Sequence, residues 1–210
     1  MDLIAELALA AALAWGAGFR LYAVVFLAGL AGKLGWVPLP PALAYLTHDG
    51  VLWVSGAFLI LEFLADKIPA VDSVWDAIQT FIRVPGAMVL AWGAFGDHGE
   101  AAQFAAMLLG GSIAGVTHLG KAGTRVLINH SPEPVSNWIA SFSEDGIVVF
   151  GLWLAITHPI AFLVALALFL LLLAWLLPKL WLAFASLFRR LRYSKPLLNS
   201  ASGNGAPPTS

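Results

Sequence analysis

Long apolar runs, broken by single charges and short polar segments, dominate the chain. Residues 3–19 are apolar except for Glu6 and predict a first helix. Arg20 separates this run from a second apolar run over residues 21–34. Three prolines within residues 36–41 cannot continue a helix, so the pattern predicts a turn there.

The next segments are short compared with the thickness of a bilayer. Residues 42–48 predict a short helix, and residues 51–65 are apolar except for Glu62. A helix needs about 20 apolar residues to cross a hydrocarbon core of about 30 Å. We therefore expect residues 51–65 either to extend through their own charges or to span only part of the bilayer.

Proline and glycine punctuate the middle of the chain. Residues 72–83 predict an amphipathic helix, and Val84-Pro85-Gly86 predicts a break after it. Residues 87–96 are apolar but too short to cross alone. Residues 101–117 predict a helix rich in small residues, of the kind that packs closely against other helices in lipid.

A polar stretch over residues 118–145 precedes the most apolar part of the chain. His158-Pro159 predicts a kink or turn between apolar residues 146–157 and a helix over 160–187. The basic segment 188–195 then favours a cytoplasmic C-terminus by the positive-inside rule. Residues 194–210 are rich in Pro, Gly, Ser and Asn and predict a disordered tail.

Composition changes this picture from apolar helices to a membrane protein. Apolar residues make up 60% of the 210 residues, charged residues only 11%, and mean hydropathy is +0.86, whereas a soluble domain carries about 25% charged residues. We predict an all-α, polytopic helical membrane protein, one transmembrane domain over residues 1–193, with about six membrane segments, some broken or re-entrant. The net charge of −1 offers no basic field for nucleic acid. The absence of cysteine excludes disulfides, thiolate nucleophiles and Cys-ligated metals.

A short sequence recurs in the two halves of the chain. Ala17-Gly18-Phe19-Arg20 is similar to Ala122-Gly123-Thr124-Arg125, and each copy precedes a proline-containing segment with carboxylates. Chance can produce this match, because glycine and alanine are abundant. The alternative is a two-fold internal repeat over about 1–96 and 97–193. Many transporters are built from two inverted repeats whose interrupted helices meet at a binding site in the midplane.

Glu62 and Asp66 lie four residues apart and therefore share one face of a helix. Two ionised carboxylates so placed repel each other and need a cation, a proton or a basic partner. Lys67 and Arg83 are the nearest basic residues. Oxygen ligands suit a hard cation such as Na⁺, Mg²⁺ or Ca²⁺, so Glu62 and Asp66 are candidate ligands for one, with a site that needs no cofactor as the alternative.

Two further stripes carry polar side chains at helical spacing. The first, over residues 72–83, is either the wet face of an interfacial helix or a wall of a water-filled vestibule. The second starts at His118 and continues on a following helix at Asn137. Because a charge in hydrocarbon costs several kcal/mol, these faces point to other helices or to a cavity, and function is the default interpretation. Structural ion pairs of Arg20 or Arg125 with Glu62 or Glu144 are the alternative. Together with Arg20, the stripes supply these candidate transport or binding residues: Arg20, Glu62, Asp66, Lys67, Asp72, Asp76, His118, Lys121, Arg125, Asn129, Asn137, Ser141, Glu144 and Asp145.

Residues 62–76 read EFLADKIPAVDSVWD and contain the motif E-x-x-x-D-K-x-P-x-x-D. With the runs KAGTR at 121–125 and SPEPVSN at 131–137, and with Glu144-Asp145, this segment resembles a bacterial membrane family known as domain of unknown function 4126. The resemblance covers most of residues 15–160 and implies a multi-pass protein of the bacterial cytoplasmic membrane. The family name implies no established activity, so the resemblance supports the location of the site more than any reaction.

Three functions are compatible with these features. The first hypothesis is a small transporter or channel for an ion or small polar solute, whose acids bind a cation or carry a proton and whose bases balance the charge. The second is a membrane-embedded, Mg-dependent enzyme that modifies lipids through Asp66, Asp72 and Asp76, although the DGxxAR element of the phosphatidyl-alcohol transferases is missing. The third is a non-catalytic lipid-binding or scaffold protein. We expect the lipid bilayer and the solute as partners, expect no nucleic acid, and leave homo-oligomerisation open.

Overall fold

The computed structural model describes residues 2–96, 98–129 and 134–193, apart from some side chains within the helices. Every regular element in this part of the chain is a helix, so the predicted all-α fold is confirmed. The predicted disordered tail lies outside the described residues. In chain order the elements are α1 (Leu3–Lys33), the 3-10 helix η1 (Pro41–Thr47), α2 (Asp49–Ala65), α3 (Pro69–Ala94), α4 (Glu100–Asn129), α5 (Pro134–Thr157) and α6 (Pro159–Tyr193).

The helices have the length and composition of membrane segments. Within the described residues, α1, α4, α5 and α6 are each long and apolar enough to cross a bilayer. The pair η1 and α2, bent by 67°, makes a fifth candidate if it counts as one broken span. The chain is therefore a polytopic helical membrane protein, and the predicted count of about six segments is approximate.

Residues 1–173 form one compact unit and residues 174–210 form another. The first unit contains α1 to α5 and the start of α6, and it contains the core and the candidate site described below. Its core consists largely of small and aliphatic side chains on α1, including Ala12, Leu13 and Val24, packed on α3, α4 and α5.

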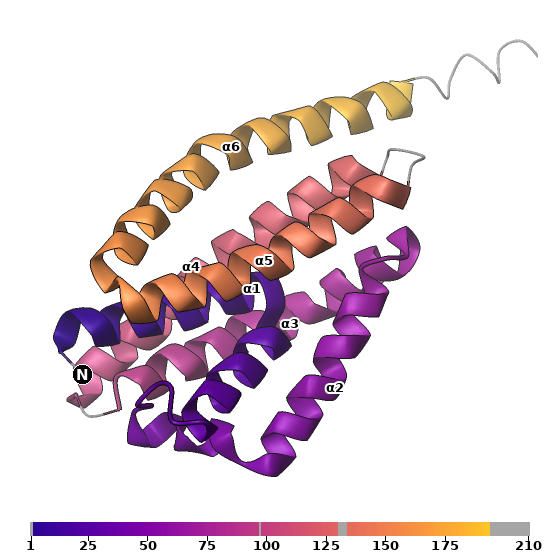
Figure 1. The fold of residues 1–210 in the computed structure, drawn as a ribbon. Helices are drawn as coiled ribbons and strands as arrows, with labels where there is room; N and C mark the ends of the chain where they lie inside the picture. Colours follow the sequence, from indigo (N-terminus) through magenta and orange to yellow (C-terminus); the bar gives the residue numbers. More distant parts are fainter. Residues whose placement is uncertain (1, 97, 130–133, 194–210) are drawn as a thin grey trace, which may run out of the picture. The chain divides into compact units, whose positions relative to one another are not determined.

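Helix α1 is broken at Arg20 and folds back on itself (Figure 1). Arg20 has the extended backbone angles φ −149° and ψ 86°, which no helix contains. A Cβ atom on Gly16 would lie 2.7 Å from Cγ2 of Val24, although eight residues of straight helix span about 12 Å. The predicted separation of residues 3–19 from the run that follows Arg20 is therefore a sharp reversal of the chain.

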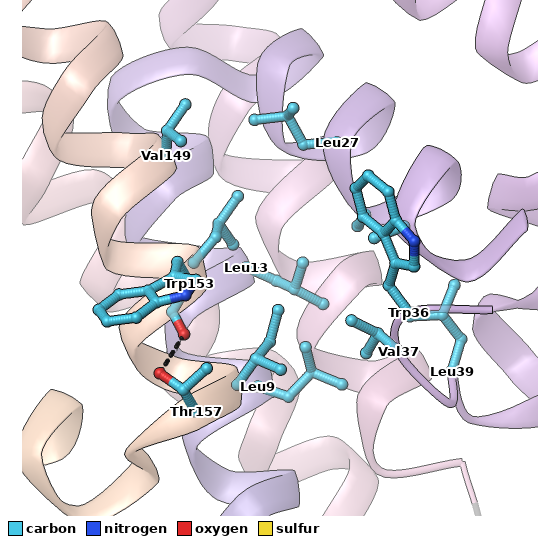
Figure 2. A pocket seen from close by; sticks show the side chains of 13 residues that line it. Leu9, Leu13, Leu27, Trp36, Val37, Leu39, Val149, Trp153 and Thr157 are labelled. Carbon is cyan, nitrogen blue, oxygen red and sulfur yellow. Dashed lines mark hydrogen bonds between the residues drawn. The ribbon is translucent and has the colours of Figure 1, made fainter. Parts of the chain in front are cut away.

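An apolar cavity of about 330 Å³ also shows that the two arms of α1 lie beside each other (Figure 2). Leu9 and Leu13 line it from the first arm, and Leu27 lines it from the second. Trp36 and Trp153 contribute from the loop after α1 and from α5. In a straight helix Leu9 and Leu27 would be about 27 Å apart.

Both ends of α1 lie at the same end of the bundle. Near its start, Glu6 Oε2 lies 2.6 Å from His98 Nε2, just after α3. At its last residue, Lys33 pairs with Asp49, the first residue of α2. Between α1 and α2, η1 packs on the end of α3, since a Cβ on Gly93 would touch Leu43. The first arm is about 26 Å long and the second about 20 Å, and the chain therefore returns after Arg20 to the end of the bundle from which α1 starts.

The tip of α1 packs closely against α4. A Cβ on Gly18 would lie 2.7 Å from the carbonyl oxygen of Ala114 and 2.7 Å from Cβ of Thr117. Only a residue without a side chain permits this approach. The contact places the broken end of the first arm beside the polar face of α4.

The predicted break at Val84-Pro85-Gly86 is wrong, because α3 continues through Pro85 to Ala94. Proline inside a helix loses one hydrogen bond and crowds the preceding turn. Packing outweighs this cost here, since the residues after Pro85 that include Ala87, Leu90 and Ala91 are buried in the core. The expected amphipathic helix and the short apolar run are therefore parts of one helix.

Candidate functional site

Charged side chains from five helices meet around the tip of α1. We call them the ionic cluster: Arg20 of α1, Glu62 and Asp66 at the end of α2, Asp76 and Arg83 of α3, Lys121 and Arg125 of α4, and Glu144 and Asp145 of α5. Seven of the nine residues are buried, and Glu144 and Asp145 are half-buried. The cluster therefore lies inside the helix bundle.

Arg20 is the centre of one side of the cluster. Its Nη2 lies 2.7 Å from Oδ2 of Asp66, and its Nε lies 2.6 Å from Oδ1 of Asp145. The same Nη2 donates a hydrogen bond of 2.9 Å to the hydroxyl of Ser141. Because the helix breaks at Arg20, its long side chain extends from the tip of α1 to both α2 and α5.

One carboxylate oxygen of Asp66 lies close to several basic side chains. Besides Arg20, its Oδ2 lies 3.4 Å from Nη2 of Arg125 and 3.7 Å from Nζ of Lys121. Its Oδ1 is buried and has no hydrogen-bond partner within the described part of the chain. One carboxylate therefore joins bases from α1 and α4, and half of its acceptor capacity stays unused by these residues.

Lys121 connects the two sides of the cluster. Its ammonium lies 3.5 Å from Oδ1 of Asp76 and 3.3 Å from Oε2 of Glu144, as well as beside Asp66. It also donates to the carbonyl oxygen of Phe19 at 3.3 Å. The break in α1 deprives the last carbonyls of the first arm of helical partners, and Lys121 satisfies one of them inside the bundle.

Arg83 organises the second side of the cluster. It pairs with Glu62 of α2, and its Nη1 donates to Oδ1 of Asp76 at 2.8 Å. Nη1 also lies 3.0 Å from Nδ1 of His118. A guanidinium only donates, so Nδ1 of His118 accepts, and its Nε2–H donates to the hydroxyl of Thr80 at 2.7 Å. His118 is therefore neutral in this arrangement.

Arg125 binds Glu144 with two parallel hydrogen bonds. Its Nε lies 2.9 Å from Oε1 of Glu144, and its Nη2 lies 3.0 Å from Oε2. Nη1 donates at 3.3 Å to the backbone carbonyl of Asn137, near the start of α5. This bidentate geometry is the strong form of the arginine–carboxylate pair and joins α4 to α5.

The cluster contains four cationic and five anionic side chains, which gives a formal charge of −1. Lys67 brings one more positive charge to its edge. Removing charges from water costs several kcal/mol each, and partners at close range offset this cost. The arrangement is therefore nearly neutral as a whole, while each member depends on its neighbours.

Lys67 lies among aromatic rings at the end of α2. Its Nζ is 3.2 Å from the ring centre of Phe63, 4.9 Å from that of Phe142 and 5.3 Å from that of Trp138. Burial lowers the pKa of Lys67 and so does nearby Arg20, whereas the carboxylates of Asp145 and Asp66 oppose the shift. Lys67 is thus a cation at the edge of the cluster that is held by rings.

Most members of the ionic cluster are among the candidate residues named from the sequence. All of the candidate residues except Asp72, Asn129 and Lys67 contact the ionic cluster or belong to it. The side chains of Asp72 and Asn129 lie outside the described residues. Lys67 contacts the rings of Phe63, Phe142 and Trp138 instead. Of the two bases nearest to Glu62 in sequence, Lys67 and Arg83, it is Arg83 that pairs with Glu62. The list of candidates omitted Arg83, although its spacing from Asp76 places the two on one face of α3.

The prediction that Glu62 and Asp66 bind a metal ion stays a prediction. Among the described residues, no group of three or more His, Asp or Glu side chains is arranged to hold a metal ion. Glu62 and Asp66 contact different arginines, Arg83 and Arg20. Each keeps one oxygen, Oε2 or Oδ1, without a hydrogen-bond partner in the described part of the protein.

Comparisons with known proteins identify a family and no function. The family described as Domain of unknown function (DUF4126) matches residues 7–179. No curated protein and no solved structure matches the chain. The match covers most of α1, all of α2 to α5 and much of α6, and with them every member of the ionic cluster.

Proposed function

The chain belongs to the family Domain of unknown function (DUF4126), and from this premise we propose that it is a small transporter or channel for an ion or small polar solute. The ionic cluster at the tip of α1 is its binding site. The observation that carries the proposal is the ion pairing of Arg20, at the break in α1, with Asp66 at the end of α2 and Asp145 of α5.

Broken helices of this kind support transport for a physical reason. Backbone that leaves the helix inside a membrane is tolerated only where protein or a water-filled cavity satisfies it. In secondary transporters such interrupted helices supply polar groups to a solute near the midplane. Here the interruption exposes the carbonyl oxygen of Phe19 to Lys121 and directs Arg20 toward two carboxylates.

The two arginines of the repeated sequence support a site between two halves of the chain. Arg20 and Arg125 both approach Oδ2 of Asp66, at 2.7 and 3.4 Å. Both also approach Oε2 of Glu144, at 3.8 and 3.0 Å. Asp66 of the first half and Glu144 of the second are therefore each approached by both arginines, one from each half. We expect this arrangement if the repeats over about 1–96 and 97–193 enclose the site.

The ion pairs themselves suggest how a solute could be bound and released. A solute with a charged group can replace one member of a pair without leaving the other charge uncompensated, which avoids a large desolvation cost. A proton on one carboxylate would release its arginine in the same way. Asp145 is the most accessible acid of the cluster, with 28% of its side chain exposed, so we place the entry of the solute beside it.

The same proposal sets the location of the protein. We propose that it is a multi-pass protein of the bacterial cytoplasmic membrane with its C-terminus in the cytoplasm, because the segment 188–195 is rich in arginine and lysine. The reversal of α1 would then keep the N-terminus on the side where α3 ends and α2 begins.

Flux into liposomes that contain only the full-length protein tests this function. Three probes cover the main classes: protons, followed with entrapped pyranine under an imposed potential, radiolabelled sodium and radiolabelled choline. We expect flux of at least one probe above that of protein-free liposomes. Asp145→Asn should reduce it several-fold, because the entry carboxylate is lost. Asp49→Asn, which changes an exposed acid paired with Lys33, is the matched control and should keep the wild-type rate.

Absence of flux for all three probes, with protein that is folded in the liposomes, would overturn the proposal. In that case the scaffold hypothesis gains, since every charge of the cluster already has a partner of opposite sign and can act as a lock between helices. The lipid-modifying enzyme has less support, because Asp66 and Asp76 both lie beside the ammonium of Lys121, and no group of three or more His, Asp or Glu side chains among the described residues is arranged to hold a metal ion.

A further inference from the structure

Three aromatic rings beside the ionic cluster form a cation site. Phe63 lies on α2, and Trp138 and Phe142 lie one turn apart on α5. The ring of Phe142 meets that of Phe63 edge to face, with 5.6 Å between the ring centres. We call these three residues the aromatic cage. They belong to two helices that are distant in the sequence, so the tertiary fold brings the rings together.

The ammonium of Lys67 occupies the aromatic cage. All three ring centres lie within 6 Å of Nζ, which is the range in which the face of a ring attracts a cation. Nζ also donates to the carbonyl oxygen of Phe63 at 3.3 Å. Within the described residues it forms no ion pair. A charged group of the chain itself therefore rests on rings, although Asp66 is its neighbour in sequence.

Charges of both signs lie near the aromatic cage. The carboxylates of Asp145 and Asp66 and the guanidinium groups of Arg20 and Arg125 all act electrostatically on Lys67. Rings together with a nearby carboxylate recognise alkylated ammonium groups, whose weakly hydrated charge is stabilised by ring faces. A lysine in such a place is a tethered substitute for a free ligand with the same head group.

We propose that the aromatic cage binds the organic ammonium group of the solute, and that Lys67 occupies it until the solute displaces it. This names the class of solute and therefore rests on the proposed function. The cage contacts Lys67, and Lys67 is near Asp145, where the cluster is most accessible. A solute whose ammonium enters the cage can therefore place a second polar group among the side chains of the cluster.

Calorimetric titration of the full-length protein in phosphatidylglycerol nanodiscs tests this assignment. The probe is choline, and its neutral isostere 3,3-dimethyl-1-butanol tests the need for charge. Lys67→Ala empties the cage and should raise the affinity for choline about tenfold over wild type, because choline no longer has to displace a tethered ammonium from the rings. The neutral isostere should gain no affinity.

Two further variants separate the cage from general effects. The double variants Lys67→Ala/Trp138→Leu and Lys67→Ala/Phe142→Leu should each lose the gain in choline affinity. Both rings are about half exposed, so these substitutions leave the core intact. Lys179→Ala is the matched control, because Lys179 also rests on a ring, that of Trp175, outside the cage. It should bind choline as wild type does.

A lipid headgroup and a free solute can both supply an organic ammonium group. Nanodiscs that also contain phosphatidylcholine distinguish them: weaker choline binding there assigns the aromatic cage to a headgroup, and unchanged binding assigns it to a free solute. Either result supports an ammonium site. Equal choline affinity of wild type and Lys67→Ala, or equal affinity with and without Trp138, would overturn it. Because binding is measured without flux, binding without transport would defeat only the proposed function, and transport without binding would defeat only the aromatic cage.

Discussion

Nη2 of Arg20 lies 2.7 Å from Oδ2 of Asp66, and both side chains are completely buried. The pair joins the tip of α1, where the helix reverses, to the end of α2 across 46 residues of sequence. A buried pair costs free energy to desolvate, and breaking it leaves a charge without a partner. Breaking this pair should therefore cost more free energy of unfolding than forming it contributes.

Replacing Arg20 by glutamine should destabilise the protein by about 3–5 kcal/mol, because Asp66 and Asp145 lose their closest cation inside the bundle. Thermal unfolding in detergent, followed by circular dichroism, measures the change. Adding Asp66→Asn to Arg20→Gln should restore part of the loss, since the uncompensated charge is then gone.

The matched control for Arg20→Gln is Lys33→Gln, which breaks the ion pair at the other end of α1. That pair is exposed, with 43% and 72% of its two side chains accessible, so its loss should cost less than about 1 kcal/mol. Equal destabilisation by the two variants would show that Arg20 is not a buried member of the cluster.

Substituting Gly18 by alanine should destabilise the protein by about 1–3 kcal/mol through overpacking. The added methyl group would meet backbone and Thr117 of α4 at 2.7 Å, and these atoms cannot move without shifting the helix. Gly146→Ala on α5 is the control, because its methyl group would meet nothing within 4 Å and should stabilise the helix by up to about 1 kcal/mol. Similar unfolding temperatures for both variants would contradict the close approach of α1 and α4.

Choline affinity of the wild-type protein should rise with pH, whereas that of Lys67→Ala should stay flat. Loss of its proton removes the charge that competes for the aromatic cage. Since the pKa of Lys67 is lowered, the rise should begin below the pH at which an exposed lysine titrates. Asp145, Arg20 and Arg125 of the neighbouring helices, and the adjacent Asp66, act electrostatically on Lys67. Parallel pH profiles for the two proteins would argue against Lys67 as the competitor.

The periodic pattern of the sequence predicts which faces are polar but not which residues pair. The interruption at Arg20 was visible as a charge between two apolar runs. Whether such a charge kinks, ends or reverses a helix depends on contacts made far along the chain, here with Asp66 and Asp145. For the same reason the spacing of Asp76 and Arg83 indicates a shared face, whereas the pairing of Arg83 with Glu62 depends on how α2 packs.

Proline was an unreliable indicator of where a helix ends. Pro85 interrupts nothing because the core packs residues on both sides of it into one helix, whereas His158-Pro159 does separate α5 from α6. Residues that follow each proline belong to the core, Ala87 and Leu90 after Pro85 and Phe162 and Leu166 after Pro159. An apolar pattern after a proline therefore does not tell which proline ends a helix.

Site-directed cysteine labelling tests the reversal of α1 at Arg20 most directly, and on it depends the placement of the whole ionic cluster. The chain has no cysteine, so Asp2→Cys, Leu34→Cys and Ile68→Cys each introduce a single exposed thiol. A membrane-impermeant maleimide is applied to right-side-out and inside-out vesicles from expressing cells. We predict that Cys at positions 2 and 34 reacts in one kind of vesicle and Cys at position 68 in the other. Reaction of positions 2 and 34 from opposite sides would show that α1 crosses the membrane as a continuous span and would contradict the account.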